Sequence, residues 1–157
     1  MEYQQKFTPQ QALVKARHYC AYQERCHMEV KEKLYGFGLN SNETDQLLST
    51  LIEEDFLNEE RFAIAYAGGH FRTKYWGKVK ISHALKQKQV SPFCIKKALQ
   101  QIDEEDYIKT LQKLFDEKLR TLKNEKNLFV KKHKLQDHLI RKGFETNLVR
   151  ELTTGVR

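Results

Sequence analysis

The sequence predicts an all-α protein made of three tandem three-helix repeats, each helix-turn-helix-like, in an elongated and curved array. Its 157 residues include only seven Gly and two Pro, too few for the many turns of a sandwich or barrel. Apolar residues recur at helical spacing, and no strand candidate interrupts them. A unit of about fifty residues recurs along the chain and is too small to bury much surface alone, so such units pack in series.

The repeat is visible as pairs of apolar residues five positions apart near the end of one helix in each block. The pairs are Leu34 and Leu39, Leu85 and Val90, and Leu139 and Phe144. Five positions beyond the second member come Ile95 and Val149, whereas the first block has the weaker Thr44. We therefore expect a loose lead over residues 1–7, followed by repeats at 8–57, 58–102 and 103–157.

In the first repeat, Thr8 followed by Pro9 predicts a capped helix start. The spacing from Cys26 to Glu29 is that of a capping box with cysteine in the place of serine, and this second helix ends at residues 36–38. A third helix with leucines at 47, 48 and 51 ends near residues 55–57.

The second repeat begins with Asn58 as a cap, with Glu59 and Glu60 in the first turn. Its other helices are expected after residues 76–77 and after Ser91. In the third repeat Asp103 caps a long helix with a broad apolar face, a second helix follows Asn124, and a short helix ends the chain.

Positive charge is concentrated in the middle of the chain. Residues 58–101 hold nine Lys or Arg and only two acidic residues, which equals the formal excess of +7 of the whole chain. The flanking blocks cancel, and the pI is near 9.2. This imbalance favours a polyanionic partner, nucleic acid first.

The strongest binding candidates lie in the aromatic and basic segment at residues 71–80. Its cations can neutralise phosphates or face carboxylates, while its aromatic rings can stack on bases or anchor a protein interface. The candidates are Arg72, Lys74, Tyr75, Trp76, Lys78 and Lys80, extended by Lys86, Lys88, Lys96 and Lys97. The alternative is that Phe71 and Trp76 are core residues and the lysines a solvated face.

The third repeat holds a second basic set among acidic neighbours, for which a solvated face is an equal alternative. Its members are Lys131, Lys132, Lys134, Arg141 and Lys142.

Other chemistry finds little support. Cys20, Cys26 and His27 lack metal-ligand spacing, and no CxxC or HExxH occurs, so we expect no metal or other cofactor. The acidic run at residues 103–106 fits a helix start, and no nucleophile is paired with a base, so we expect no enzyme. Three dispersed cysteines, no signal core and no long apolar run predict a cytoplasmic protein without disulfides, and we expect a monomer.

Three ordered motifs, within a resemblance from about Ala12 to Leu152, are similar to those of the RecX family, the regulators of the RecA recombinase. Residues 51–63, LIEEDFLNEERFA, match the pattern L-x-E-x-G-(FYL)-L-(DN)-(DE)-x-R-F-A. Residues 77–88 resemble G-x-x-(KR)-I-x-x-x-L-x-x-K, and Leu139 to Phe144 resembles L-x-(KR)-(KR)-G-F. Two departures are Gly68-Gly69, where we expect a kink or a close helix approach, and Cys26 at a capping position.

The resemblance implies three tandem three-helix repeats and a non-enzymatic, mainly inhibitory regulator that binds RecA along the groove of the RecA–DNA filament. Filament growth, ATPase, strand exchange and the repressor cleavage of the SOS response would then fall. Single- or double-stranded DNA alone would be bound weakly and without sequence preference. The alternative is a helix-turn-helix protein that reads duplex DNA without RecA, although the lysine-rich middle block offers few residues for bidentate base contacts.

Overall fold

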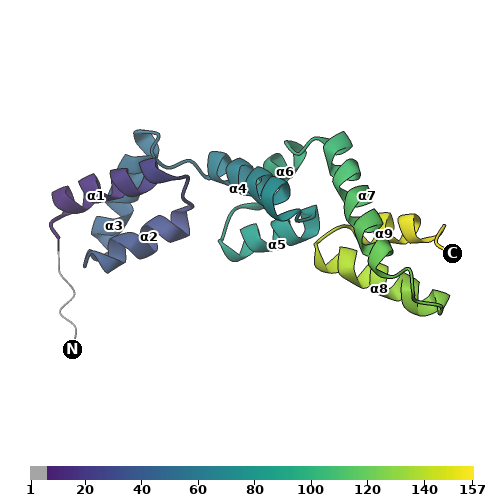
Figure 1. The fold of residues 1–157 in the computed structure, drawn as a ribbon. Helices are drawn as coiled ribbons and strands as arrows, with labels where there is room; N and C mark the ends of the chain where they lie inside the picture. The colour runs from purple at the N-terminus through teal and green to yellow at the C-terminus, as the bar shows by residue number, and fades with distance from the viewer. Residues whose placement is uncertain (1–6) are drawn as a thin grey trace, which may run out of the picture. The chain divides into compact units, whose positions relative to one another are not determined.

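A computed structural model describes residues 7–157, and within that range the chain forms nine helices and no strand (Figure 1). The predicted fold class, all-α, is confirmed. Residues 1–6 of the predicted lead lie outside the described part. Its last residue, Phe7, is packed: its N–H donates to the Phe37 carbonyl (3.0 Å), and the two rings meet edge to face at 5.5 Å.

The chain divides into two compact units. The first holds residues 7–65 and Leu85–Lys97, and the second holds Tyr66–Ala84 and Ala98–Arg157. The helices in chain order are α1 Pro9–Tyr22, α2 His27–Gly36, α3 Ser41–Glu53, α4 Glu59–Lys74, α5 Lys78–Gln87, α6 Pro92–Gln100, α7 Glu104–Thr121, α8 Leu128–Arg141 and α9 Thr146–Thr153. The division falls within three helices: within α4 after Ala65, within α5 after Ala84, and within α6 after Lys97. No helix of residues 7–157 is both long enough and apolar enough to span a bilayer.

The predicted caps form, with one exception. Thr8, Asn58 and Asp103 accept from the backbone N–H three residues on, at 3.2, 2.9 and 3.0 Å. The exception is α8, which the sequence predicts to begin after Asn124 but which begins at Leu128. Asn127, rather than Asn124, caps this helix by accepting from the Val130 N–H at 3.2 Å, because the chain first makes a further turn after α7.

The three pairs of apolar residues that lie five positions apart in the sequence form the C-terminal caps of α2, α5 and α8. In each, the N–H of the second residue donates to the carbonyl of the first: Leu39 to Leu34, Val90 to Leu85, and Phe144 to Leu139, at 3.1–3.4 Å. This is the Schellman motif, in which a residue at positive φ reverses the chain and the apolar pair makes contact. The positive-φ residues are Gly38, Gln89 and Gly143.

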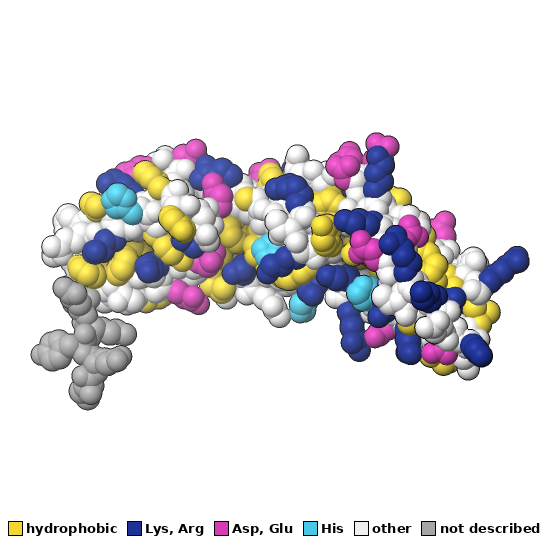
Figure 2. Space-filling view, in the orientation of Figure 1, with side chains coloured by type: hydrophobic (Ala, Val, Ile, Leu, Met, Phe, Trp, Pro, Cys, Tyr) yellow, Lys and Arg dark blue, Asp and Glu magenta, His cyan; other side chains and the backbone are white. Residues whose placement is uncertain are grey.

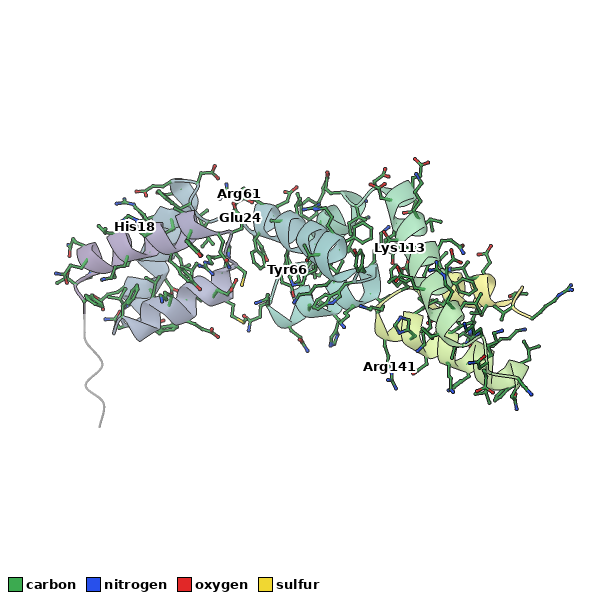
Figure 3. The ribbon with its side chains drawn as sticks, in the orientation of Figure 1. His18, Glu24, Arg61, Tyr66, Lys113 and Arg141 are labelled. Atoms are coloured by element: carbon green, nitrogen blue, oxygen red, sulfur yellow. The ribbon has the colours of Figure 1, made fainter. Side chains whose placement is uncertain are left out.

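The turn between α3 and α4 is held by Arg61 in the first unit. The side chains of Arg61 and Glu24 meet with an Nε–Oε1 distance of 2.6 Å (Figure 3). The same guanidinium donates to the Asp55 carbonyl (3.0 Å) and lies 3.1 Å from its carboxylate. Asp55 adopts φ 63° where the family pattern has glycine. These contacts explain why the 51–63 motif contains an arginine.

One hydrophobic core cluster of this unit is made of α1–α3, the turn after α2 and Leu57, which lies two residues before α4. Its buried members are Ala12, Ala16, Cys20, Val30, Leu34, Leu39, Leu47, Leu48, Leu51 and Leu57. Thr44, which replaces the Ile or Val of the other repeats, is also fully buried, and its hydroxyl has no partner among residues 7–157.

The glycine pair does not bring a helix close. α4 continues through Gly68 and Gly69 to Lys74. A Cβ on Gly69 would meet nothing within 4 Å, and the three atoms nearest to one on Gly68 belong to the guanidinium of Arg72 from the same helix. The expected close helix approach is therefore wrong. Instead, Gly68 leaves space into which the Arg72 side chain folds back along its own helix.

Candidate nucleic-acid interface

The turn between α4 and α5 positions the aromatic and basic segment within the second unit. Tyr75 adopts φ 57°, and its N–H donates to the Phe71 carbonyl at 3.1 Å. The Trp76 N–H donates to the His70 carbonyl at 3.3 Å. The turn therefore ends α4 with its own backbone hydrogen bonds and holds both aromatic residues in fixed positions.

Gly77 and Gly143 bring the α4–α5 turn against the α8–α9 turn, backbone to backbone. The Gly77 N–H donates to the Lys142 carbonyl (2.8 Å), and the Val79 N–H donates to the Gly143 carbonyl (2.9 Å). A Cβ on Gly77 would lie 2.3 Å from the Gly143 carbonyl carbon. A Cβ on Gly143 would lie 2.2 Å from the Lys80 Cβ. Only glycine at both positions permits this approach.

Tyr107 of α7 is the buried centre of the same junction. Its hydroxyl accepts from the Lys78 N–H (2.9 Å) and donates to the Glu145 carboxylate at the start of α9. Its ring packs against Phe71 and Phe144, with centroids 5.8 and 5.2 Å away. Burial, together with the bond to Glu145, raises the pKa of Tyr107 far above its usual value. The hydroxyl therefore remains a donor at all physiological pH values.

A column of rings runs along the C-terminal half of α4. The Tyr66 and His70 rings stack at 3.9 Å, and the Trp76 ring follows at 4.6 Å from His70. Lys74 and Lys80 place their ammonium groups 5.4 and 4.7 Å from the centroid of the Trp76 ring. Each ammonium lies over the Trp76 ring within cation–π range, so positive charge is held against this aromatic surface. Sequence reasoning missed Tyr66 and His70, whose i, i+4 spacing was the available signal.

The second unit brings part of the third-repeat basic set beside the aromatic segment. The Lys142 ammonium donates to the Lys74 carbonyl at 3.4 Å, and Lys80 lies against Gly143. Arg72, Lys74, Tyr75 and Lys80 are exposed, and Trp76 is half-buried. We call the set Arg72, Lys74, Tyr75, Trp76, Lys80 and Lys142 the junction surface. Dark-blue side chains gather over this unit in Figure 2.

Other predicted residues have different surroundings. The Lys78 ammonium lies 3.0 Å from Glu104 and over the Tyr107 ring, so its charge is compensated within the fold. Lys131 donates to the Arg157 carbonyl (3.3 Å), and Lys132 is half-buried. Arg141 pairs with Asp137 at 3.2 Å and points away from α8 (Figure 3).

Four predicted lysines belong to the first unit. Lys86, Lys96 and Lys97 are exposed there, and Lys88 lies 3.8 Å from Glu29. One further cation of the second unit escaped sequence reasoning. Lys113 of α7 places its ammonium 5.1 Å from the centroid of the Tyr75 ring.

The junction surface suits contact with a polyanion. Exposed ammonium and guanidinium groups can neutralise phosphates, and the Tyr75 and Trp76 rings hold lysine ammonium groups over their faces. Positive charge near this surface also acts on His138, because burial and the neighbouring Lys118 and Lys142 lower the pKa of its imidazole. No cluster of three or more His, Cys, Asp or Glu able to hold a metal ion occurs among residues 7–157.

Comparison with known proteins bears on these motifs directly. Residues 58–99 match the family model of the second three-helix domain of RecX, and residues 104–152 match that of the third. Together the two ranges cover more than half of the chain. The chain belongs to the RecX family. The glycines of the two RecX-like motifs, Gly77 and Gly143, are the pair whose backbones meet at the junction.

Relatives extend the similarity into the first repeat. The chain is 28% identical over 141 residues to the Regulatory protein RecX of Bacillus cytotoxicus, covering 89% of this chain and 52% of that protein. It is 32% identical over 132 residues to that of Clostridium perfringens, covering 81% and 61%. The chain thus spans about half the length of the Bacillus relative.

Solved RecX structures share the fold. The crystal structure of RecX from Lactobacillus salivarius superposes with a TM-score of 0.82 at 22% identity, covering 92% of this chain and 93% of that one. A second RecX crystal structure gives the same TM-score at 23% identity.

Proposed function

We propose that this chain is a mainly inhibitory regulator that binds RecA and the RecA–single-stranded-DNA filament, limiting filament growth, ATPase activity and strand exchange. Membership of the RecX family carries the proposal, since the matched relatives are named regulatory proteins. The junction surface supports it chemically, because exposed cations and aromatic rings are placed together within one unit.

The junction surface contacts the DNA or acidic protein surfaces of the filament. Lys74 and Lys80 keep their ammonium groups exposed against the Trp76 ring, and Arg72 lies on the same segment. Exposed cations gain modest energy individually, so binding depends on many contacts repeated along a regular filament. DNA alone offers only part of these contacts and is bound weakly, with strong dependence on salt.

The test is the single-stranded-DNA-dependent ATPase of the source organism's RecA, titrated with this protein and with two variants. The first variant combines Arg72→Glu, Lys74→Glu and Lys80→Glu. Lys78 stays unchanged, because its ammonium is paired with Glu104 and its reversal would disturb the fold. The control combines Lys31→Glu, Lys109→Glu and Lys126→Glu, which makes the same change in net charge at exposed positions outside the junction surface.

We expect the unmodified chain and the control to inhibit at substoichiometric amounts, and the junction variant to lose inhibition while remaining folded. Inhibition that persists in the folded junction variant would keep RecA as the partner and move the contact elsewhere. No effect of the unmodified chain at any ratio would refute the proposal and favour the DNA-binding alternative.

A further inference from the structure

A groove between α7 and α9 lies apart from the residues of the junction surface. Two adjoining hollows, of about 400 and 530 Å³, share Gln112, Leu152 and Gly155 in their linings. Their volumes lie in the range of about 300–1,000 Å³ typical of ligand sites. Both hollows are lined entirely by residues of the second unit.

The groove exists because α7 carries a wider apolar stripe than its own repeat buries. Tyr107, Leu111, Leu114 and Phe115 are buried, but Ile108 remains 43% exposed. Further along α7, Leu119 is only half-buried at the groove wall. The stripe left facing the groove spans Ile108 to Leu119, about 16 Å or three helical turns.

α9 supplies the facing wall through Leu148 and Leu152, which are one turn apart and half-buried. Beyond its end, Gly155 lines both hollows without a side chain, and a Cβ there would meet nothing within 4 Å. Two helices presenting apolar side chains at turn spacing make the kind of groove that accepts a third amphipathic helix.

The charge around the groove is uneven. Four basic residues, Arg120, Lys123, Lys131 and Arg157, line one hollow, and no acidic residue does. The other hollow has a single charged lining residue, Glu151. Neither Arg120 nor Lys123 has an ion-pair partner among residues 7–157. Hydrophobic side chains appear between Lys and Arg side chains near the C-terminal end in Figure 2.

We propose that the groove between α7 and α9 binds an amphipathic helix of a partner protein, with acidic residues flanking its apolar face. The apolar face contacts Ile108, Leu119, Leu148 and Leu152. The carboxylates meet the basic end of the groove, so the more acidic end of the partner helix lies toward Arg120 and Lys123. This site is distinct from the junction surface and does not depend on the proposed role in RecA regulation.

The test uses a fluorescein-labelled synthetic peptide of about 14 residues, long enough for three to four helical turns. It carries Leu at i, i+3, i+4 and i+7 and Glu at flanking positions, and a matched peptide carries Lys in place of Glu. Binding to the full chain is followed by fluorescence anisotropy, and amide chemical shifts locate the contact. We expect the Glu peptide to bind at least about tenfold more tightly than the Lys peptide.

Gly155→Phe adds an aromatic ring at a residue that lines both hollows and removes no side chain. Gly36→Phe adds the same ring in α2, where a Cβ likewise meets nothing within 4 Å. We expect Gly155→Phe to weaken Glu-peptide binding about tenfold or more, the scale of one lost leucine contact. Gly36→Phe should leave binding unchanged, and chemical shifts should move at Ile108, Leu148 and Leu152. Thermal unfolding of both variants verifies that they are folded.

Equal affinity for the two peptides, unchanged binding to Gly155→Phe, or shifts confined to other residues would each overturn the proposal. Sedimentation equilibrium without peptide measures whether the chain forms a dimer. A dimer of the unmodified chain that dissociates in Gly155→Phe would assign the groove to a second copy and overturn the acidic-helix proposal.

Discussion

Replacing Gly77 with alanine should separate the two turns that form the junction in the second unit. Gly77 does not have positive φ, so alanine fits the local backbone and any effect arises from the added methyl group. That methyl would lie 2.3 Å from the Gly143 carbonyl carbon and oxygen and 2.4 Å from the Phe144 nitrogen. These are backbone atoms, which cannot rotate away as a side chain does.

The structure sets the size of the effect. Overpacking a filled site costs about 1–3 kcal/mol. Separating the turns also removes the hydrogen bonds from the Gly77 and Val79 N–H groups, each with a net value of about 0.5–1.5 kcal/mol. We therefore expect Gly77→Ala to lower the free energy of unfolding by about 4 kcal/mol, and the melting temperature by about 10 °C.

Urea unfolding and amide hydrogen exchange measure both parts of this prediction. The Gly77 and Val79 amides should lose protection in Gly77→Ala. The matched control is Gly69→Ala in α4, where a Cβ meets nothing within 4 Å; it should stabilise the helix by up to about 1 kcal/mol. If Gly77→Ala unfolds within about 0.5 kcal/mol of the unmodified chain, the steric argument for the junction is refuted.

Two further predictions concern buried and paired groups. Tyr107→Phe should destabilise the second unit by about 1–3 kcal/mol, because the Lys78 N–H and the Glu145 carboxylate lose their shared partner; an unchanged urea midpoint would contradict this. Folding raises the pKa of Tyr107, so the contribution of this tyrosine to the free energy of unfolding is complete below pH 10 and falls as the pH rises above 10. Ultraviolet titration above pH 10 should show Tyr107 still protonated in the folded chain. The hydrogen bonds from Arg17 lower the pKa of Glu54. The pair therefore stabilises the fold at pH values above the ordinary carboxyl pKa, and this stabilisation is lost as the pH falls through the lowered pKa of Glu54. Carbon-detected NMR should show the Glu54 titration return to its ordinary range in Arg17→Ala, and an unchanged titration would refute the assignment.

Much of the fold could be predicted because its signals are local. The five-residue pairs were recognisable because a Schellman cap fixes the spacing of its apolar contact, whatever the rest of the chain does. The Thr8, Asn58 and Asp103 caps depend on residues three positions apart. The start of α8 was misplaced because Asn124 and Asn127 are both suitable caps, and only the turn after α7 selects between them.

The candidate site was predictable only in part, because its contacts join distant segments. Tyr107 looked like one apolar residue among many, yet its hydroxyl links Lys78 to Glu145, 29 and 38 residues away in sequence. The proximity of Lys142 to Lys74 depends on the close approach of Gly77 and Gly143, which no local pattern encodes. The charge concentration was visible, but the pairing of Lys78 with Glu104 required the fold.

The most direct test of the central claim compares binding of a fluorescently labelled chain to three targets at one salt concentration. The targets are preformed RecA–single-stranded-DNA filaments, the same single strand alone, and duplex DNA. Our account predicts saturable binding to filaments, far tighter than to either DNA. For the single strand alone, it also predicts how the logarithm of the binding constant falls with the logarithm of the salt concentration. The slope should be smaller in magnitude by about 2 for the variant that combines Arg72→Glu, Lys74→Glu and Lys80→Glu, because three phosphate contacts are lost. Equal affinity for filament and bare DNA, or tight sequence-selective binding to duplex without RecA, would contradict it.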